Sequence, residues 1–295
     1  MSSPRTSWAL SASADAGSGE SSDEKNTEGR KNRVVLGYKA MLTSYLAAGT
    51  MSVTRSSGFS SSLLRVIAGY IVMPAGLSYI LISAAANNRL GSDTYKRLNL
   101  SMLGYSGIGL AVVKLSKGRN QLLALALILS LINCTKGYVY GVLGWDKKND
   151  TSVFNDITKG SVDSVKGFFS IPKNFASFGY QVALIMVAYL KIERLLEVLR
   201  FIKASSIDAQ GLAMPLAHLN RLVLMSLCLY TLKDAAERDR LGGTTFIELN
   251  LICSLSLAAQ FLFDTGGVTT PVGVLSGFFA VFCALNGIGL YLKKG

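Results

Sequence analysis

Two stretches of the sequence are copies of each other: AAANNRLGSDTYKRLNL at residues 84–100 and AAERDRLGGTTFIELNL at residues 235–251. Nine of the seventeen aligned positions are identical, including the Arg-Leu-Gly triplet in the middle and Leu-Asn-Leu at the end. Self-similarity at a fixed separation indicates an internal duplication. The sequence therefore predicts two related parts, each organised around one copy of this stretch.

The similarity continues beyond the two copies. After a shift of two residues, Asn133 pairs with Asn286. Within each copy, one apolar helix should end just before Arg-Leu-Gly and another should begin just after it. Gly91 is expected to adopt the left-handed conformation that closes the first helix, and Gly242 is expected to do the same in the second copy.

The composition is that of an integral membrane protein. Of the 295 residues, 50% are hydrophobic and 16% are charged, whereas about 25% are charged in soluble proteins. The net charge is +12, and its excess lies in and around the apolar segments, which favours contact with anionic lipid headgroups. Basic residues do not cluster with aromatic ones in a polar domain, which excludes nucleic acid as a partner. We therefore predict an all-α integral membrane fold in a lipid bilayer.

Seven segments are apolar enough to be considered as crossings, because about 20 helical residues span the hydrocarbon core. They are residues 63–85, 98–113, 121–143, 175–190, 216–232, 246–263 and 272–292. The second and fourth are short, but the second aligns with the sixth through Leu-Asn-Leu, so that each supports the other. About seven transmembrane helices are expected.

The seven segments form two three-helix repeats joined by a linker helix. The first repeat covers residues 63–143 and the second covers residues 216–295. The polar connection between them, residues 144–215, carries the linker helix 175–190 and then an amphipathic helix. If the linker crosses the bilayer, both repeats have the same orientation, and if it lies on the surface they are inverted. We favour a crossing linker.

The chain before residue 63 is expected to lie outside the bundle. Residues 1–33 are rich in Ser, Ala, Gly and charge and are predicted to be disordered. Residues 34–62 are predicted to be an interfacial segment, because Gly37, Gly49 and several Ser and Thr dilute their apolar pattern. The Ser-rich beginning is also typical of transit peptides, which makes a plastid or mitochondrial membrane one alternative location.

Polar residues inside the apolar segments mark a candidate substrate path. Asn99 and Asn250 lie in the second helix of each repeat, Asn133 and Asn286 lie in the third, and Lys136 follows Asn133 by one turn. An amide or ammonium group in hydrocarbon is costly unless it finds a partner or lines a wet cavity. The asparagines are therefore expected to face inward, either around a solute path or in hydrogen bonds between helices. Lys136 either joins them or extends to the membrane surface.

The layout of three, one and three helices resembles that of the SWEET and PQ-loop sugar transporters. Asn133 and Asn286 are similar to the substrate-pocket asparagines of those families, and the resemblance implies a substrate site between the repeats. It covers the topology and this residue pair only. The sequence has no Pro-Gln dipeptide. The prolines that those families repeat in their helix bundles are reduced here to Pro74 and the boundary residue Pro215.

Catalytic and metal-binding chemistry is not indicated. The four cysteines lie in apolar runs without Cys-x-x-Cys spacing and are interpreted as small buried side chains; they are Cys134, Cys228, Cys253 and Cys283. His218 is the only histidine, which rules out a metal site built from several histidines. No cluster of His, Asp and Glu indicates an enzyme, and no cofactor is predicted.

Two functions remain as hypotheses. The first is a transporter or pore for a small solute, with its path between the two repeats. The second is a non-transporting scaffold or accessory subunit that binds protein partners in the membrane. Under the first, Asn133→Ala or Asn286→Ala should abolish solute flux. Under the second, changes on the amphipathic face of residues 191–203 should release a partner.

Overall fold

The computed structural model is all-helical in the part of the chain that it describes, which comprises residues 22–55, 71–116, 121–145, 152–203, 209–263 and 271–292. These residues form nine helices and no strand. Three helices are long and apolar enough to cross a membrane, at Asp93–Leu115, Gln121–Leu143 and Gly273–Leu292. The prediction of a helical fold is confirmed for these residues, and the three candidate spans support integration into a membrane. Seven crossings and an internal repeat stay predictions.

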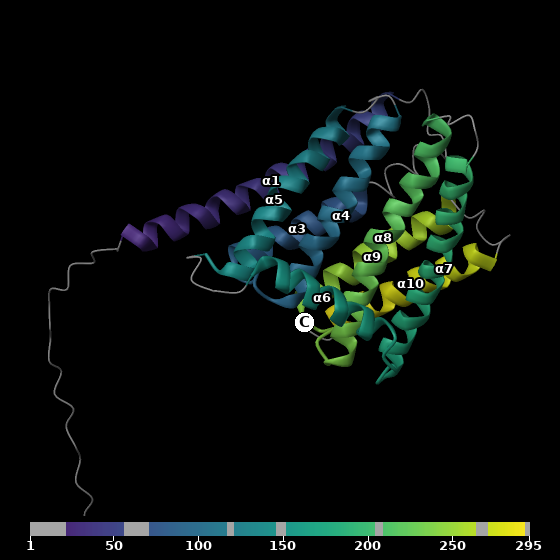
Figure 1. The fold of residues 1–295 in the computed structure, drawn as a ribbon. Coiled ribbons are helices and arrows are strands. Elements are labelled where there is room, and N and C mark those ends of the chain that lie inside the picture. The colour runs from purple at the N-terminus through teal and green to yellow at the C-terminus, as the bar shows by residue number, and fades with distance from the viewer. Residues whose placement is uncertain are drawn as a thin grey trace, which may run out of the picture.

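The first four helices pack together as one group (Figure 1). They are α1 (Ser22–Arg55), α3 (Met73–Ala86), α4 (Asp93–Leu115) and α5 (Gln121–Leu143). Helix α1 packs against both α3 and α5, and α4 packs along α5. Residues 56–70 and 117–120 lie outside the described part of the chain.

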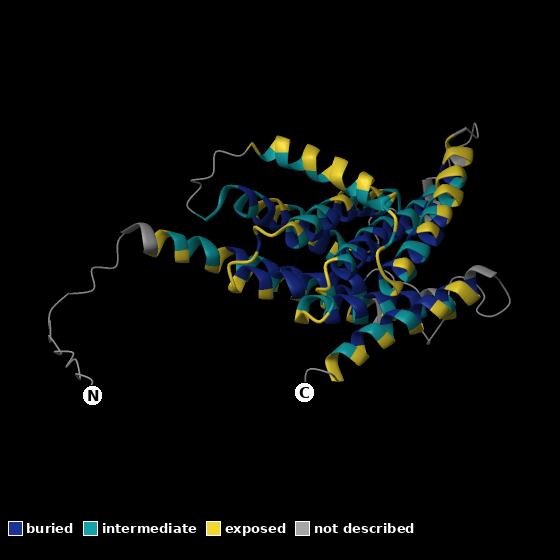
Figure 2. Cartoon of the chain, turned by 90° about the horizontal axis from the view of Figure 1, so that it is seen from below, coloured by how far each residue is buried: buried dark blue, intermediate teal, exposed yellow. Residues whose placement is uncertain are grey.

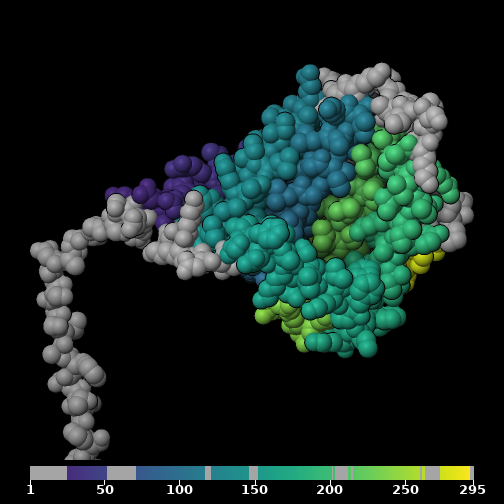
Figure 3. Space-filling view, in the orientation of Figure 1, coloured from purple at the N-terminus to yellow at the C-terminus, as the bar shows by residue number. Residues whose placement is uncertain are grey.

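The later helices form a second group beside the first. They are α7 (Phe175–Lys203), α8 (Ala209–Glu237), α9 (Thr244–Phe263) and α10 (Pro271–Leu292), and the short helix α6 (Val153–Phe168) precedes them. Helix α7 packs along α8, and α9 packs along α10. The two groups meet where α4 packs on α8 and α3 packs on α9. Figure 3 shows them side by side, with α6 spread across the lower part of the same face.

The two groups come close because small residues lie at their junction. Asn220 of α8 is fully buried and donates Nδ2 to the Tyr105 carbonyl of α4 at 2.9 Å. Gly109 of α4 lies beside it, where a Cβ would be 3.3 Å from the Asn220 Nδ2. On the other side of the junction, a Cβ at Gly76 would lie 2.6 Å from Ile252 of α9. The buried centre of the molecule in Figure 2 lies between these helices.

Helix α1 is part of the bundle, which differs from the prediction of a separate interfacial segment at residues 34–62. One face of α1 is buried, at Val34, Tyr38, Met41, Tyr45 and Ala48. The glycines that were taken to dilute its apolar pattern are the points of close approach: Gly37 lies against Asn133 of α5, and Gly49 lies against Ile71. Small residues weaken a hydropathy signal while they strengthen helix packing. Residues 56–62 lie outside the described part of the chain.

Disorder was predicted for residues 1–33, but the last part of this range is helical. Residues 22–33 are helical and continue into the packed part of α1. Arg30 donates Nη1 to the Trp145 carbonyl at 2.9 Å and so ties this end of α1 to the end of α5. Charge and low hydropathy alone did not indicate this contact, because its acceptor is a backbone group 115 positions away. Residues 1–21 lie outside the described part of the chain.

The predicted linker helix, residues 175–190, is the first part of the 29-residue helix α7. Its buried face packs against α8 and includes Tyr180, Ala183, Leu184, Val187 and Leu190. Helix α7 is therefore a full member of the second group, and the polar connection predicted at 144–215 includes two long helices of the bundle, α7 and the first turns of α8. The segment that connects the two groups is α6, which lies across one end of them (Figures 1 and 2).

The two copied stretches fold into the same turn. The Arg89 amide bonds to the Ala84 carbonyl at 2.8 Å, and the Arg240 amide bonds to the Ala235 carbonyl at 2.9 Å. The left-handed residue of each turn is Asn88, with φ of 54°, and Asp239, with φ of 52°. The prediction placed this conformation at the glycines three residues later and was wrong. Asn and Asp tolerate it because their short polar side chains bond locally.

Gly141 provides a test of the close packing at the end of α5. A Cβ at this position would lie 2.6 Å from the Leu90 carbonyl oxygen, which is backbone and has no rotamer with which to move away. We expect Gly141→Ala to lower the free energy of unfolding by about 1–3 kcal/mol. Thermal unfolding of the detergent-solubilised protein, followed by circular dichroism, measures the change.

Gly104→Ala is the matched control. Gly104 lies on the exposed side of α4 with no atom within 4 Å of an added Cβ. Alanine should be neutral there or stabilise the helix by up to about 1 kcal/mol. Equal midpoints for the two variants would show that the contact between Gly141 and Leu90 is not tight.

Candidate functional site

The structure places two of the predicted asparagines in matching hydrogen bonds. Asn99 accepts a hydrogen bond from the Tyr38 hydroxyl at 2.6 Å, and Asn250 accepts one from the Tyr180 hydroxyl at 2.5 Å. Both asparagines are fully buried. Each donates Nδ2 to the carbonyl four residues earlier in its helix, at 3.1 and 3.0 Å. These carboxamides fasten α1 to α4 and α7 to α9.

The other predicted residues lie apart from any shared site. Asn133 is buried and donates to the Gly37 carbonyl at 3.2 Å, which joins α5 to α1. Asn286 is half-buried and bonds to the carbonyl one turn earlier, at 2.9 Å. Lys136 is exposed. None of the five predicted residues lines either of the two cavities described below.

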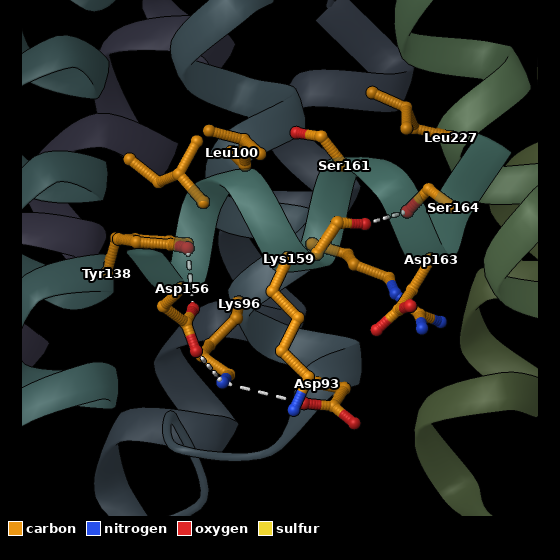
Figure 4. Close-up of a pocket in the computed structure, with 13 residues that line it drawn as sticks. Asp93, Lys96, Leu100, Tyr138, Asp156, Lys159, Ser161, Asp163, Ser164 and Leu227 are labelled. Carbon is orange, nitrogen blue, oxygen red and sulfur yellow. Dashed lines mark hydrogen bonds and ion pairs between the residues drawn. The ribbon is translucent and has the colours of Figure 1, made fainter. Parts of the chain in front are cut away.

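The larger cavity lies between α4, α5 and α8 and is covered by α6; we call it the α6 cavity (Figure 4). Its volume is about 480 Å³. Charged residues of both signs line it: Lys96, Arg97, Lys159, Asp93, Asp156 and Asp163. Because its walls come from both helix groups, the cavity lies at the junction where a path between them would open.

Ion pairs organise one side of the α6 cavity. Lys96 of α4 bonds to Asp156 of α6 at 2.8 Å and lies 3.5 Å from Asp93. The Tyr138 hydroxyl of α5 donates to the other carboxylate oxygen of Asp156 at 2.7 Å. Asp156 therefore joins α6 to both α4 and α5, and Figure 4 shows these three side chains converging. Arg97 pairs instead with Asp234 of α8 at 2.9 Å.

The environment of Asp156 lowers the pKa of its carboxyl. Partial burial by itself raises this pKa, but the hydrogen bonds from Lys96 and Tyr138 and the charges of Lys96 and Lys159 outweigh it. The carboxylate is therefore ionised at neutral pH. Its contribution to the attachment of α6 is fully present above the ordinary carboxyl range and is lost as the pH falls through the lowered pKa.

Two charged residues of the α6 cavity form no close ion pair within the described part of the chain. Lys159 and Asp163 are one helical turn apart on α6, and neither forms an ion pair with another described residue. Both are exposed. The cavity is thus lined by one ammonium and one carboxylate of α6, beside the paired groups of Lys96 and Asp156.

The far end of α6 is held by a buried lysine. Lys233 of α8 is 1% exposed and donates to the Gly167 carbonyl and to the Ser170 hydroxyl, each at 2.7 Å. Glu237 balances its charge at 2.9 Å. Helix α6 is therefore held at both ends. Asp156 attaches its start, and Lys233 binds Gly167 in its last turn and Ser170 just after it.

A second, smaller cavity of about 370 Å³ lies between the two copied turns, and we call it the turn cavity. Arg89, Arg238 and Arg240 line it together with Asp93 and Asp234. The two turns are bridged by a hydrogen bond of 2.7 Å between the Tyr95 hydroxyl and Thr245 Oγ1. This bond shows directly that the two copies of the stretch lie next to each other.

No known protein family matches the chain, and no curated protein or solved structure is significantly similar to it. The described residues contain no group of three or more His, Cys, Asp and Glu side chains that could hold a metal ion.

Sequence reasoning missed the charged residues of the α6 cavity. It treated the segment 144–174 as a polar connection, although Asp156, Lys159 and Asp163 recur at the three- and four-residue spacing of one helix face. It also missed Tyr38 and Tyr180. Both follow a glycine, but Gly-Tyr also occurs at residues 69–70, 104–105 and 137–138, so the dipeptide did not single them out.

Loss of a tyrosine hydroxyl should destabilise each helix group. We expect Tyr38→Phe to lower the free energy of unfolding by about 1–3 kcal/mol, because it leaves the buried Asn99 Oδ1 without its donor. Tyr180→Phe should cost a similar amount through Asn250. Thermal midpoints in detergent test both, with Tyr79→Phe as the control, since Tyr79 is 54% exposed. If Tyr79→Phe lowers the thermal midpoint as much as the two buried variants do, the stabilising role of the Tyr38–Asn99 and Tyr180–Asn250 hydrogen bonds is contradicted.

The attachment of α6 should depend on pH through Asp156. At neutral pH the protein should unfold at a higher temperature than its Asp156→Asn variant, because the ionised carboxylate holds Lys96. As the pH falls below the ordinary carboxyl range, the two melting temperatures should converge, since protonation removes the same interaction. A difference that persists unchanged at low pH would show that the charge of Asp156 is not what matters.

Proposed function

We propose that the protein consists of two halves of the same fold, one made of α1, α3, α4 and α5 and the other of α7, α8, α9 and α10. The matching hydrogen bonds Tyr38–Asn99 and Tyr180–Asn250 support this pairing of helices. The two copied turns, with the same pair of backbone hydrogen bonds, support it independently. Each repeat then has four helices, with α1 and α7 as its first members.

The last helix of each half fits the same scheme. Asn133 of α5 packs on Gly37, and Phe282 of α10 packs on Gly179 in the corresponding place. A fully buried cysteine follows each of them directly, Cys134 and Cys283. This correspondence pairs Asn133 with Phe282 in place of Asn286, so that the two asparagines do not occupy equivalent positions.

The two halves are related by an approximate twofold axis along the helices. The contact of α4 with α8 corresponds to that of α9 with α3, as a twofold exchange requires. Both copied turns lie at one end of the bundle and touch through Tyr95 and Thr245. The halves therefore have the same orientation, as in transporters whose repeats are related by an axis along the membrane normal.

The function that this architecture supports best is a membrane carrier for a small polar solute that bears both a positive and a negative charge. The observation that carries the proposal is the α6 cavity, which lies between the two halves and presents the charges of Lys159 and Asp163. Its volume of about 480 Å³ lies in the range of small-molecule sites. An ammonium of the solute would pair with Asp163 and a carboxylate with Lys159.

A scaffold is the second candidate, and one observation favours it. The last turns of α7 expose an apolar stripe that begins after the inward-turned Lys191, whose ammonium donates to Ser226 at 2.5 Å. The stripe consists of Ile192, Leu195, Leu196, Leu199 and Ile202, each at least 45% exposed. A protein partner in the membrane would cover it. Under this alternative, charged substitutions in the stripe release the partner and solute flux is absent.

Uptake by proteoliposomes tests the carrier. We expect the reconstituted protein to take up radiolabelled alanine, which carries both charges, in preference to lactate or glucose. Lys159→Gln or Asp163→Asn should lower alanine uptake about tenfold or more, because a lost charged hydrogen bond costs about 1.5–3 kcal/mol.

Lys166→Gln is the matched control, because Lys166 is an exposed lysine of α6 that does not line the cavity. This variant should keep full uptake. Uptake of glucose or lactate as fast as alanine, or alanine uptake that survives both cavity substitutions, would refute the proposed site.

A further inference from the structure

Helix α6 presents an apolar stripe that the bundle does not cover. The stripe consists of Phe154, Val162, Val165 and Phe169, with exposed fractions of 74%, 46%, 60% and 77%. Their separations of eight, three and four residues place them on one side of the helix. Ile171 and Phe175 continue the apolar surface beyond the helix, at 88% and 83% exposed. In Figure 2 the exposed residues of α6 face away from the other helices.

The charges of α6 are sorted around this stripe. Lys159 and Lys166 are seven residues apart, which places them along the same edge of the helix, and Lys173 is exposed just beyond its end. The acids lie elsewhere: Asp156 bonds to Lys96 on the inner face, and Asp163 lies across the helix from the centre of the stripe. The border of the apolar stripe is therefore positively charged.

The position of α6 in the bundle indicates which surroundings its exposed face has. Three of its hydrogen-bond partners lie near the ends of other helices: Lys96 near the start of α4, Tyr138 near the end of α5 and Lys233 near the end of α8. Because α4 and α5 are candidate spans, α6 lies at the depth where they emerge from the hydrocarbon core. Bulky apolar side chains bordered by lysines suit the headgroup region of a bilayer at this depth.

We propose that the stripe of α6 lies in the interface of an anionic lipid leaflet, with Phe154, Val162, Val165 and Phe169 among the upper acyl chains and Lys166 and Lys173 at the headgroup phosphates. The partner is the bilayer itself, and its negative surface potential attracts the lysines that border the stripe. The same helix also covers the α6 cavity, so lipid holds one side of the element that supplies Lys159 and Asp163 to the cavity.

Fluorescence quenching in vesicles tests this contact on the full-length protein. Phe169→Cys, labelled with bimane and reconstituted with phosphatidylcholine and phosphatidylglycerol, should be quenched by lipids that carry a nitroxide on the acyl chain. Iodide in the buffer should quench it several-fold less than it quenches Ser92→Cys, an exposed site in the turn before α4 at the same end of the bundle. The four native cysteines are all buried and should stay unlabelled.

A second variant tests the role of charge. Combining Lys166→Gln with Lys173→Gln should reduce the nitroxide quenching of the label at residue 169 in vesicles that contain phosphatidylglycerol and leave it unchanged in phosphatidylcholine alone. Iodide quenching at residue 169 equal to that at residue 92 would overturn the proposal. Protection from both quenchers would overturn it too, because it would show that a protein surface covers the stripe.

Discussion

An unpaired polar atom on a buried side chain is costly, and this cost favours the positions that α1 and α7 take. Asn99 and Asn250 are fully buried among apolar helices, and an unpaired oxygen there would cost about 1–3 kcal/mol. In each case the missing donor is a tyrosine hydroxyl from a helix far away in sequence. Helix α1 packs on α3 and α5 and α7 packs along α8, while small residues at Gly76 and Gly109 let the two groups approach each other.

Apolar burial and enclosed hydrogen bonds stabilise the bundle, and ion pairs add to them at one end. Arg97 pairs with Asp234 between α4 and α8, and Lys233 pairs with Glu237 within α8. Helix α6 is attached near its start by the ion pair of Asp156 with Lys96, whose side chains are 20% and 17% exposed. Screening by salt and protonation weaken such a pair. The attachment of the helix that covers the cavity should therefore depend on salt and on pH.

The sequence allowed most of the helices to be predicted, because their apolar runs are long. Helix α5 has the predicted bounds, and α9 and α10 begin within two residues of them. The role of α1 was not predictable from hydropathy, since Gly37 and Gly49 lower the apolar signal and act only when a partner such as Asn133 is present. Asn99 and Asn250 lie in hydrogen bonds between helices, which is the alternative to a solute path that the sequence left open. Their partners, Tyr38 and Tyr180, lie in helices that were not assigned to the repeats.

Three of the charged residues that line the α6 cavity lie in the first copied stretch, and the others lie on α6, outside both copies. Asp93, Lys96 and Arg97 of the first copy align with Thr244, Ile247 and Glu248 of the second. Helix α6 itself follows the first group and has no described counterpart after α10. The cavity is therefore a departure from the twofold relation that we propose for the two groups. A ligand that occupies it would bind with a stoichiometry of one per chain. The two groups, although alike in fold, would then have different functions.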